Sequence, residues 1–531
     1  MPDSSLERAI DAATVGVPKG FPEPARFLLY PEITRDIDDL SKRIEFRLTS
    51  YKATVTRMPD LAPPVLVLTL PECAFETADA AAFEAAYLMV DEWRLPSVEP
   101  ELYTDHFPEQ EQDGSWPGES EETGKLCFVS TDPRVDANPG WAVEKIHAAA
   151  AWEYSAKQGR PTMGVGIVIA QPDTGVTQHP ELKDIPRLGE IDLIDGGSKA
   201  RDPLDIGNKG HGTGTASVML SRSSGLVTGS APGATHMPIR AIRTVVRISQ
   251  ARVAEAINHA VDNGAHVITM SLGGLPSLAL SRAVSRAVKK NLIVLAAAGN
   301  CVRMVVWPAR YDNCIAVAGI NIDNQMWKGS SRGPSVAFSA PGENVMKAAA
   351  ELNDDGVEKH MHAQGQGTSF AVAMTAGVAA LWLAHHNRDY LVAEAEKYGE
   401  TLQQMFRRLI CATAYVPAIG WDEWSLGTGI VNALDLLKAP LDLNVGEESN
   451  PVPPEFTNAE SIESMLTEFG GDAAETDLNL YGMELANLSL EASRCCTESS
   501  ETLEAVTLQV SRRVVAQVSA ELLKKLAAGA P

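Results

Sequence analysis

The sequence predicts an α/β protein with a mainly parallel sheet and helices on both faces. A small α+β module precedes this domain, and an acidic, partly helical tail follows it. Apolar runs of strand length alternate with helical patterns from about residue 137 to 440. Residues 27–103 carry a β-α-β-β-α-β order, which is typical of a small ferredoxin-like module. After residue 441 the composition becomes strongly acidic, with fifteen acidic side chains and one basic side chain over residues 441–510.

These shifts predict four segments along the chain. They are a module over residues 1–103, an acidic linker over 104–136, the α/β domain over 137–440 and a C-terminal extension over 441–531. The first 25 residues are expected to form a loose leader. Strands are predicted over 27–30, 46–56, 65–70 and 95–103, and helices over 34–44 and 77–93. In the extension, amphipathic helical patches are predicted over 461–469 and 505–526.

The linker has the composition of a solvated segment. Residues 104–124 contain seven Asp or Glu side chains and no Lys or Arg. Like charges together with Gly and Pro favour an extended, accessible chain that a protease could cut.

Length and charge limit the classes of function. A chain of 531 residues is long enough for two or three domains, one of them with a deep core. A net charge of −24 argues against nucleic acid and anionic membranes as partners. No apolar run is expected to span a membrane, since the longest, around 292–299, has strand length. The N-terminus lacks the basic start of a signal peptide, and the seven cysteines include no CxxC pair. We therefore expect a cytoplasmic protein without a disulfide scaffold, with non-classical secretion as an alternative.

One apolar helix is expected at the centre of the α/β domain. Residues 365–383, GQGTSFAVAMTAGVAALWL, begin with a turn and continue with almost no polar side chain. A helix that is apolar on every side has no face for solvent, so it should cross the middle of a core. Ser369 lies at its start, where an N-cap serine is the ordinary interpretation.

Other polar residues fall at related positions. Asp173, residues 271–274 and Asn300 each follow the predicted end of a buried strand, whereas His211 and Ser369 begin helices. In open parallel sheets, functional groups gather at the carboxyl ends of the strands and at the helix starts that follow them. An Asp, a His and a Ser at one sheet edge are the side chains that nucleophilic catalysis by a serine hydroxyl requires.

The motifs around these residues resemble those of subtilisin-like serine proteases. They comprise Asp173-Thr174-Gly175 with His179-Pro180-Glu181-Leu182, Gly210-His211-Gly212-Thr213, Met270 to Gly274, Ala296 to Asn300, and Gly367-Thr368-Ser369 with Ala376-Gly377. The order Asp, His, Ser is the order of that family. The resemblance covers about residues 137–437.

The resemblance implies a serine endopeptidase that acts on polypeptide substrates. Asp173, His211 and Ser369 would form the catalytic triad, and Asn300 would contribute to the oxyanion hole. Ser271, Leu272 and Gly273 would bind the substrate strand. The N-terminal module would be an intramolecular inhibitor of a zymogen. The Trp307–Pro308 peptide bond is expected to be cis, as in the matching turn of the family.

Three positions depart from the family pattern. Gly214 stands where many members carry a second histidine, Ala373 replaces a usual proline, and Pro172 precedes Asp173 where an aliphatic residue is usual. A non-catalytic scaffold of the same fold, which binds proteins without cutting them, stays open as an alternative.

Three further alternatives rest on local patterns. Residues 329–333 match the GxSxG elbow of other hydrolases around Ser331, but Pro334 argues against the helix that this elbow requires. His360 and His362 lie two residues apart, and they are expected to be exposed loop residues rather than metal ligands. Glu181 is the only plausible calcium ligand near the loop at 221–225, and Ca²⁺ needs six or more oxygens. We expect neither a metal nor a cofactor.

Overall fold

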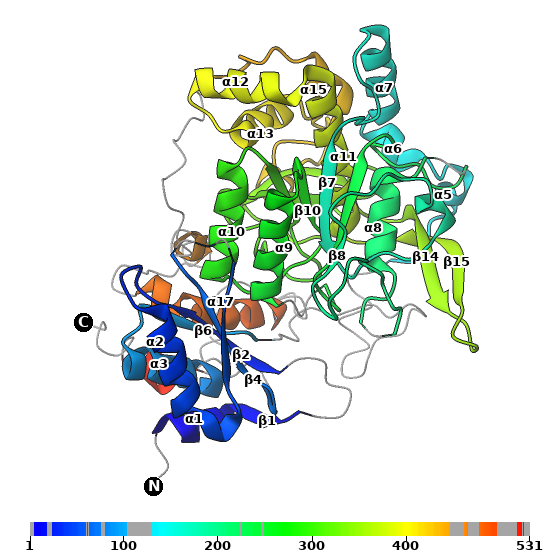
Figure 1. Ribbon diagram of the computed structural model, residues 1–531. Helices are drawn as coiled ribbons and strands as arrows, with labels where there is room; N and C mark the ends of the chain where they lie inside the picture. The colour runs from blue at the N-terminus through cyan, green and yellow to red at the C-terminus, as the bar shows by residue number, and fades with distance from the viewer. Residues whose placement is uncertain are drawn as a thin grey trace.

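A computed structural model describes residues 5–17, 24–59, 61, 63–75, 80–102, 129–205, 207–222, 225–245, 249–445, 461–465, 477–495, 518–522 and 524 of the chain (Figure 1). The large domain contains a seven-stranded parallel sheet with the order β13-β12-β11-β10-β7-β9-β8. Its strands are β7 Val168–Asp173, β8 Ile191–Asp192, β9 Thr235–Arg240, β10 Val267–Met270, β11 Ile293–Ala297, β12 Ile315–Ile320 and β13 Val336–Pro341. The central strands are buried along their whole length, as expected for a parallel sheet covered by helices on both faces. The predicted α/β class is confirmed.

Pro172 lies inside the strand β7. Proline has no backbone N–H, so at such a position it would normally interrupt the hydrogen bonds between neighbouring strands. The Val168 carbonyl accepts a hydrogen bond from the His266 N–H. The backbone N–H and C=O groups of the even-numbered residues of β7 therefore point toward β10. Pairing of β7 with β10 extends only to Ala170. Pro172 therefore lies beyond the paired part of that ladder, and no strand hydrogen bond is lost.

The helices of the large domain surround this sheet. They are α5 Pro133–Ala137, α6 Trp141–Lys145, α7 Ala148–Lys157, α8 His211–Leu220, α9 Gln250–Asp262, α10 Leu278–Lys289, α11 Thr368–His386, α12 Arg388–Tyr398, α13 Leu402–Ala412, α14 Glu423–Leu426 and α15 Ala433–Lys438. A hairpin of β14 Val345–Leu352 and β15 Glu358–Gly365 leads into α11.

The predicted central helix is α11, and every residue from Thr368 to His385 is buried. By length and composition alone α11 could cross a membrane, so the expectation that no apolar run reaches that length is wrong. All of that apolar window is buried inside the domain, however, as the core helix of an α/β fold requires.

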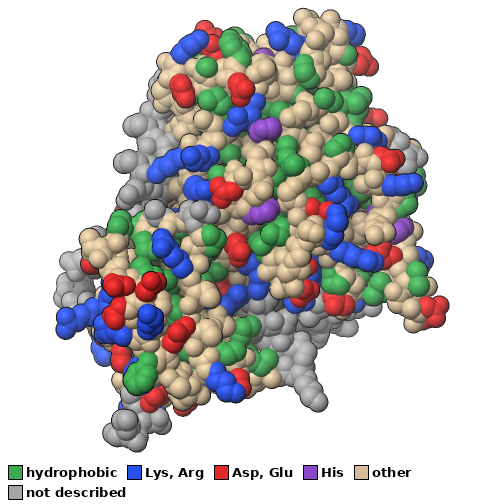
Figure 2. Space-filling view, in the orientation of Figure 1, with side chains coloured by type: hydrophobic (Ala, Val, Ile, Leu, Met, Phe, Trp, Pro, Cys, Tyr) green, Lys and Arg blue, Asp and Glu red, His purple; other side chains and the backbone are tan. Residues whose placement is uncertain are grey.

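The N-terminal module has a four-stranded antiparallel sheet with the order β3-β4-β2-β6. Its elements are α1 Ser5–Ala13, β1 Thr14–Gly16, β2 Ala25–Tyr30, α2 Ile37–Arg47, β3 Thr54–Arg57, β4 Leu66–Leu70, β5 Cys73–Phe75, α3 Ala80–Trp93 and β6 Ser97–Pro100. Acidic and basic side chains are mixed over this module in Figure 2. Among the ion pairs of the module, Arg47 pairs with Glu7 at 2.9 Å and with Glu92 at 3.0 Å.

Two predictions for this module are wrong. The supposed loose leader contains α1, because Leu6, Ile10 and Ala13 recur at helical spacing and are buried together. The strand predicted over 46–56 begins only at Thr54, because α2 continues through Arg47 and a short 3₁₀ turn follows it. The order of β2, α2, β3, β4, α3 and β6 agrees with the prediction, whereas the two-stranded sheet of β1 and β5 was not predicted.

The module docks on the starts of α9 and α10 through two glutamates that lie at or just after β6. Glu101 accepts hydrogen bonds from Ser249 Oγ at 2.8 Å and from the Ala251 N–H at 2.7 Å, at the start of α9. Glu99 accepts from the Leu278 N–H at 2.9 Å, at the start of α10. Each carboxyl group thus accepts a hydrogen bond from a backbone donor that a helix start leaves free.

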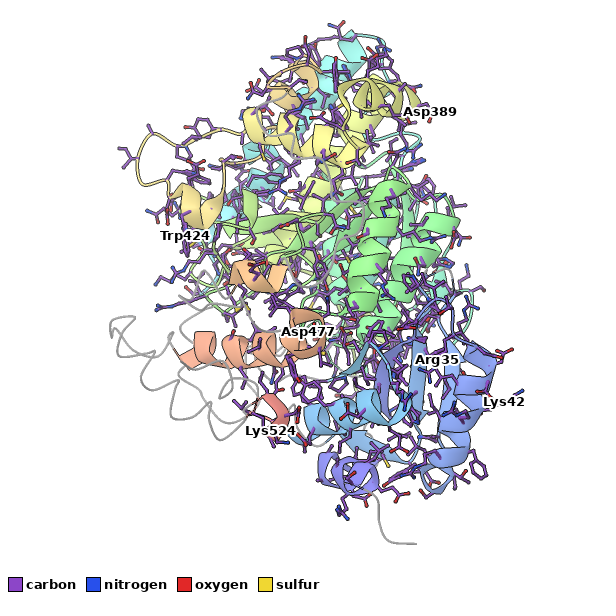
Figure 3. The ribbon with its side chains drawn as sticks, turned by 90° about the vertical axis from the view of Figure 1, so that its left-hand side faces the viewer. Arg35, Lys42, Asp389, Trp424, Asp477 and Lys524 are labelled. Carbon is purple, nitrogen blue, oxygen red and sulfur yellow. The ribbon has the colours of Figure 1, made fainter. Side chains whose placement is uncertain are left out.

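Beyond residue 445, the described parts of the C-terminal extension are a helical turn over 461–465, residues 477–495 with the helix α17 Leu478–Cys495, residues 518–522 and residue 524. Figures 1 and 3 show α17 beside the N-terminal module rather than in solvent. The predicted patch over 461–469 is helical in its described part. Most of the patch predicted over 505–526 lies outside the described residues.

Candidate active site

Asp173 and His211 meet at the carboxyl edge of the sheet. Asp173 ends β7 and His211 begins α8, and Nδ1 of His211 lies 2.8 Å from Oδ1 of Asp173. The second carboxylate oxygen accepts hydrogen bonds from Thr215 Oγ1 at 3.2 Å and from Gln171 Nε2 at 3.3 Å. The Asp173 side chain is 2% exposed and the His211 side chain 15% exposed. A carboxylate bound to one ring nitrogen leaves Nε2 as the free position of the imidazole.

The glycines of the two motifs allow this approach. A β-carbon placed on Gly212 would lie 2.1 Å from the carbonyl oxygen of Gly175, so only glycine permits α8 to start this close to β7. This contact explains the glycine after His211. The glycine after Asp173-Thr174 has its own reason, because a β-carbon on Gly175 would lie 2.8 Å from the Ala200 carbonyl oxygen.

Sequence reasoning missed Asp202, a buried carboxylate behind the pair. Its oxygens accept hydrogen bonds from Thr174 Oγ1 at 2.8 Å, from the Gly210 N–H at 2.8 Å and from the Leu204 N–H at 2.9 Å. Burial raises the pKa of Asp202 to about 6. Asp202 thus connects Thr174, which follows Asp173, to Gly210, which precedes His211, through hydrogen bonds. Its position in an irregular loop, away from any strand end, gave no sequence signal.

Ser369 lies in the first turn of α11, and α11 packs against α8. Its backbone carbonyl accepts a hydrogen bond from Ser271 Oγ at 3.0 Å, which ties the helix start to the end of β10. The residue is 4% exposed. The start of a helix directs unpaired N–H groups and a positive dipole end toward this position, an arrangement that favours negative charge.

Asn300 is held beside the same helix start. Its Oδ1 accepts from the Thr368 N–H at 3.0 Å and from Thr368 Oγ1 at 2.9 Å, so the amide orientation is defined. A β-carbon on Gly367 would lie 3.5 Å from Asn300 Nδ2 and 3.6 Å from the Ser369 nitrogen. The two nitrogens therefore lie close to one point, and glycine at 367, with its φ of 153°, keeps that point open.

The residues predicted to bind substrate follow β10, at the same edge. The Gly273 N–H donates to the Val245 carbonyl at 3.0 Å, so a substrate strand that uses this donor must displace Val245. Gly274 and Trp307 exchange backbone hydrogen bonds at 2.9 and 3.3 Å. The Trp307–Pro308 bond is cis, as predicted.

Comparison with known proteins assigns the chain that carries this site to a family. The subtilase family model matches residues 164–444, more than half of the chain. The chain belongs to the subtilase family. It is 31% identical over 338 residues to the thermostable alkaline protease of Halalkalibacterium halodurans, a match that covers 60% of this chain and 87% of that protein.

Other relatives match the same domain. The subtilase is 34% identical over 268 residues to thermitase from Thermoactinomyces vulgaris, over 49% of this chain and 88% of thermitase. It is 30% identical over 271 residues to subtilisin BL from Lederbergia lenta, over 49% of this chain and 93% of that protein. The fold and these relatives identify a subtilisin-like serine endopeptidase.

The structure explains one departure of this subtilase from the family pattern. A β-carbon on Gly214 would lie 3.0 Å from Cδ of Lys347 on β14. The stem of Lys347 therefore fills the space beside α8 that a second histidine would need. Burial lowers the pKa of the Lys347 ammonium to about 8.

The other candidate nucleophile is not available for chemistry. Ser331 is fully buried, and its Oγ donates to the Val302 carbonyl at 2.9 Å. No helix follows it before β13, so the elbow interpretation of residues 329–333 is wrong.

The histidines considered as metal ligands lie on β15, so their assignment to a loop is wrong. His360 pairs with Glu358 at 3.2 Å, and His362 pairs with Glu181 at 2.8 Å. Glu181 also accepts a hydrogen bond from Ser221 Oγ. Across the described ranges, no group of three or more His, Cys, Asp or Glu side chains is placed to hold a metal ion.

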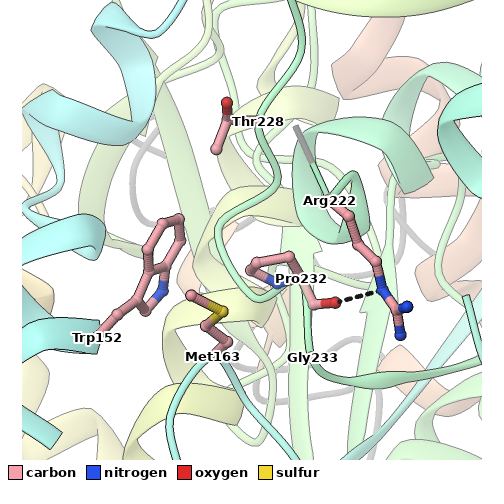
Figure 4. Close-up of a pocket in the computed structure, with 6 residues that line it drawn as sticks. All are labelled: Trp152, Met163, Arg222, Thr228, Pro232 and Gly233. Carbon is pink, nitrogen blue, oxygen red and sulfur yellow. Dashed lines mark hydrogen bonds between the residues drawn. The ribbon is translucent and has the colours of Figure 1, made fainter. Parts of the chain in front are cut away.

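The structure contains a pocket of about 410 Å³ (Figure 4). It is lined by Trp152, Met163, Arg222, Thr228, Pro232 and Gly233. Arg222 donates to the Pro232 carbonyl at 3.4 Å, and Trp152 Nε1 donates to the Ser230 carbonyl at 3.0 Å. None of the residues that line the pocket belongs to the candidate active site.

Proposed function

We propose that this subtilase hydrolyses polypeptides through an Asp173-His211-Ser369 triad and an acyl-enzyme intermediate. Ser369 Oγ attacks the peptide carbonyl while His211 Nε2 takes its proton and later gives it to the leaving amine. Water then attacks the ester with His211 again as the base. The chemistry is complete without a cofactor.

The hydrogen bond between Asp173 and His211 is the observation that carries this proposal. A buried carboxylate on Nδ1 fixes the tautomer in which Nε2 can accept a proton, and it stabilises the imidazolium that forms. The neighbouring Asn300 Nδ2 and Ser369 N–H supply donors for the oxygen that becomes negative in the tetrahedral intermediate.

Replacing Asn300 with leucine tests the oxyanion role. Leucine is similar in size but cannot donate a hydrogen bond, so kcat should fall by about 10²–10³ with little change in KM. This is the loss measured for such a donor in subtilisin, the prototype of the family. Steady-state kinetics with a peptide substrate would give both constants, and near-normal turnover would remove the assignment.

Digestion of a casein-type substrate distinguishes the enzyme from the scaffold alternative. The wild-type protein should release soluble peptides, and pretreatment with a fluorophosphonate should stop the release. A Ser331→Ala variant is a suitable control, because it removes a buried serine hydroxyl without touching the proposed triad. Intact casein after prolonged incubation with freshly processed protein would favour the scaffold.

We further propose that the N-terminal module is an intramolecular inhibitor and that the protein matures by cutting its own linker. The module ends near α9 and α10, and the described chain resumes at Val129. The Val129 N–H donates to Gln366 Oε1 at 2.9 Å, and Gln366 lies just before the Gly367-Thr368-Ser369 turn. The end of the module and Val129 of the linker thus lie on the face that carries Ser369, which supports a high effective concentration of the linker at the active site.

N-terminal sequencing of the wild-type protein beside Ser369→Ala tests self-processing. We expect a wild-type product that begins between Thr104 and Ala137, and a Ser369→Ala protein that stays full length. If the wild type digests casein while both proteins keep their original N-terminus, the module is a permanent accessory domain.

Raising the pH is expected to weaken docking of the module through Glu99. Burial raises the pKa of this carboxyl from its ordinary 4.5 to about 7, although the Tyr30 hydroxyl, the Leu278 N–H and the Arg282 charge act in the opposite direction. The docked state therefore binds this proton more tightly than a free module would. The stabilising contribution is complete below pH 4.5 and is lost as the pH rises through 7.

The measurement is the dissociation rate of the cut module at pH 5 and pH 8. The wild type should release the module faster at pH 8, whereas Glu99→Gln cannot titrate at this position and should lose that part of the pH dependence. An identical pH profile for the two proteins would contradict the role of Glu99.

A further inference from the structure

The C-terminal extension is anchored on the subtilase domain at the turn that follows the cis peptide bond. Trp307 Nε1 donates to Ser461 Oγ at 3.0 Å, and Arg310 Nε donates to the Ser461 carbonyl at 3.3 Å. Trp307 is fully buried and Arg310 is 2% exposed. This anchor therefore excludes water, and breaking it would remove a hydrogen bond from each of two buried side chains.

The helix α17 packs directly on this anchor. A β-carbon on Gly482 would lie 2.4 Å from Cδ1 of Ile462, so the backbone of α17 touches the turn that contains Ser461. Ile462 and Met465 are fully buried. The anchor turn and α17 form one packed unit.

The helix α17 also contacts the N-terminal module. The Tyr87 hydroxyl of α3 donates to Glu484 Oε2 at 2.7 Å, and the Tyr87 and Tyr481 rings lie 5.0 Å apart. Ser97 Oγ of β6 donates to the Asn479 carbonyl at 2.9 Å. Figure 3 shows Asp477, at the start of α17, beside the junction between the large domain and the module.

Glu484 is the centre of this contact. It is 1% exposed, and besides Tyr87 it accepts hydrogen bonds from the Ser519 N–H at 2.6 Å and from Ser519 Oγ at 2.9 Å. A carboxylate is costly to bury unless donors replace its water, and here three donors from two other segments do so. An acidic tail that only solvated the protein would not bury this side chain.

We propose that the C-terminal extension is a clamp that keeps the N-terminal module bound after the linker has been cut. The proposal rests on the zymogen function argued above and adds a second step to it. Cutting the linker removes one covalent connection, but the module stays attached through α17, which is itself part of the subtilase chain. Free, active enzyme then appears only when the contacts of α17 with the module are lost.

The expected size of the effect follows from effective concentration. A module held by its own interface and also by a tethered second surface dissociates only when both contacts open together. Such linkage commonly raises the overall affinity by about 10²–10⁴ over a single contact. Losing one hydrogen bond to a charged, buried acceptor should accelerate release by roughly ten- to a hundredfold.

The test uses the full-length chain in the Ser369→Ala background, so that its own activity does not interfere. Residues 113–118 of the linker are replaced with the recognition site of an unrelated, sequence-specific protease. The protein is immobilised by an N-terminal tag, the linker is cut on the surface, and the loss of mass reports release of the large fragment. The variants are Tyr87→Phe and Tyr87→Phe with Ser97→Ala, which remove only side-chain donors from the module to α17.

Tyr51→Phe is the matched control, because the Tyr51 hydroxyl binds Glu7 and Asp11 within the module. The wild-type clamp and the control should release slowly, and the Tyr87 variants at least tenfold faster. Equal release rates for all proteins, fast or slow, would overturn the clamp. The same cut in active protein separates this outcome from the zymogen proposal: if protease activity is the same before and after release, the module is no inhibitor, whatever the release rates are.

Discussion

Replacing Ser369 with alanine is expected to lower kcat by about 10⁶. The hydroxyl is the only group of the proposed triad that forms a covalent bond with the substrate, so no other residue can take over the acyl-transfer step. Removing the corresponding serine in subtilisin, the prototype of the family, costs about 2 × 10⁶, and we take the size of the effect from that enzyme. Binding should persist, because the segment after β10 and the Asn300 amide remain.

The measurement is single-turnover cleavage of a fluorogenic peptide by processed enzyme, with the module removed in both samples. Ser271→Ala is a useful comparison, because it removes the Ser271 Oγ that donates to the Ser369 carbonyl at 3.0 Å and keeps the backbone groups expected to bind the substrate strand. It should lower activity far less than Ser369→Ala. Equal and small losses in both variants would mean that the nucleophile lies elsewhere.

Replacing Asp173 with asparagine is expected to lower kcat by about 10⁴. The amide keeps the shape of the side chain, but its nitrogen can donate to His211 Nδ1 and thereby stabilise the wrong tautomer. In an unrelated serine protease with the same constellation, this exchange costs about that factor. The hydrogen bonds to Asp173 from Thr215 and Gln171 at 3.2 and 3.3 Å favour a carboxylate at this position.

The pH profile of kcat/KM distinguishes this loss from simple unfolding. A folded Asp173→Asn enzyme should regain activity at high pH, where hydroxide can take the proton of Ser369 in place of His211. Its melting temperature should stay close to that of the wild type. A small loss of activity at neutral pH would contradict the orienting role of the carboxylate.

The sequence predicted most of the subtilase domain, because strand ends and helix starts determine where polar residues meet. Asp173, His211 and Asn300 could be assigned to one edge without any contact information, since parallel strands bring their carboxyl ends together. Asp202 could not be found in this way, because its partners Thr174 and Gly210 come from two different loops.

The contacts between segments lay beyond the sequence analysis. Glu99 and Glu101 look like ordinary acidic residues at the end of a strand, and only the docked fold places them on α9 and α10. Glu484 belongs to a stretch whose acidic composition suggests a solvated tail. Its burial depends on Tyr87, which lies almost four hundred residues earlier in the chain.

The most direct test of the proposed mechanism is to map the residue that a fluorophosphonate labels. The processed wild-type enzyme is labelled, digested with an unrelated protease and analysed by mass spectrometry, with the His211→Ala variant as a second sample. A single adduct on Ser369 in the wild type, and much slower labelling in His211→Ala, is the predicted result. An adduct on another serine, or labelling that proceeds equally fast without His211, would contradict the triad.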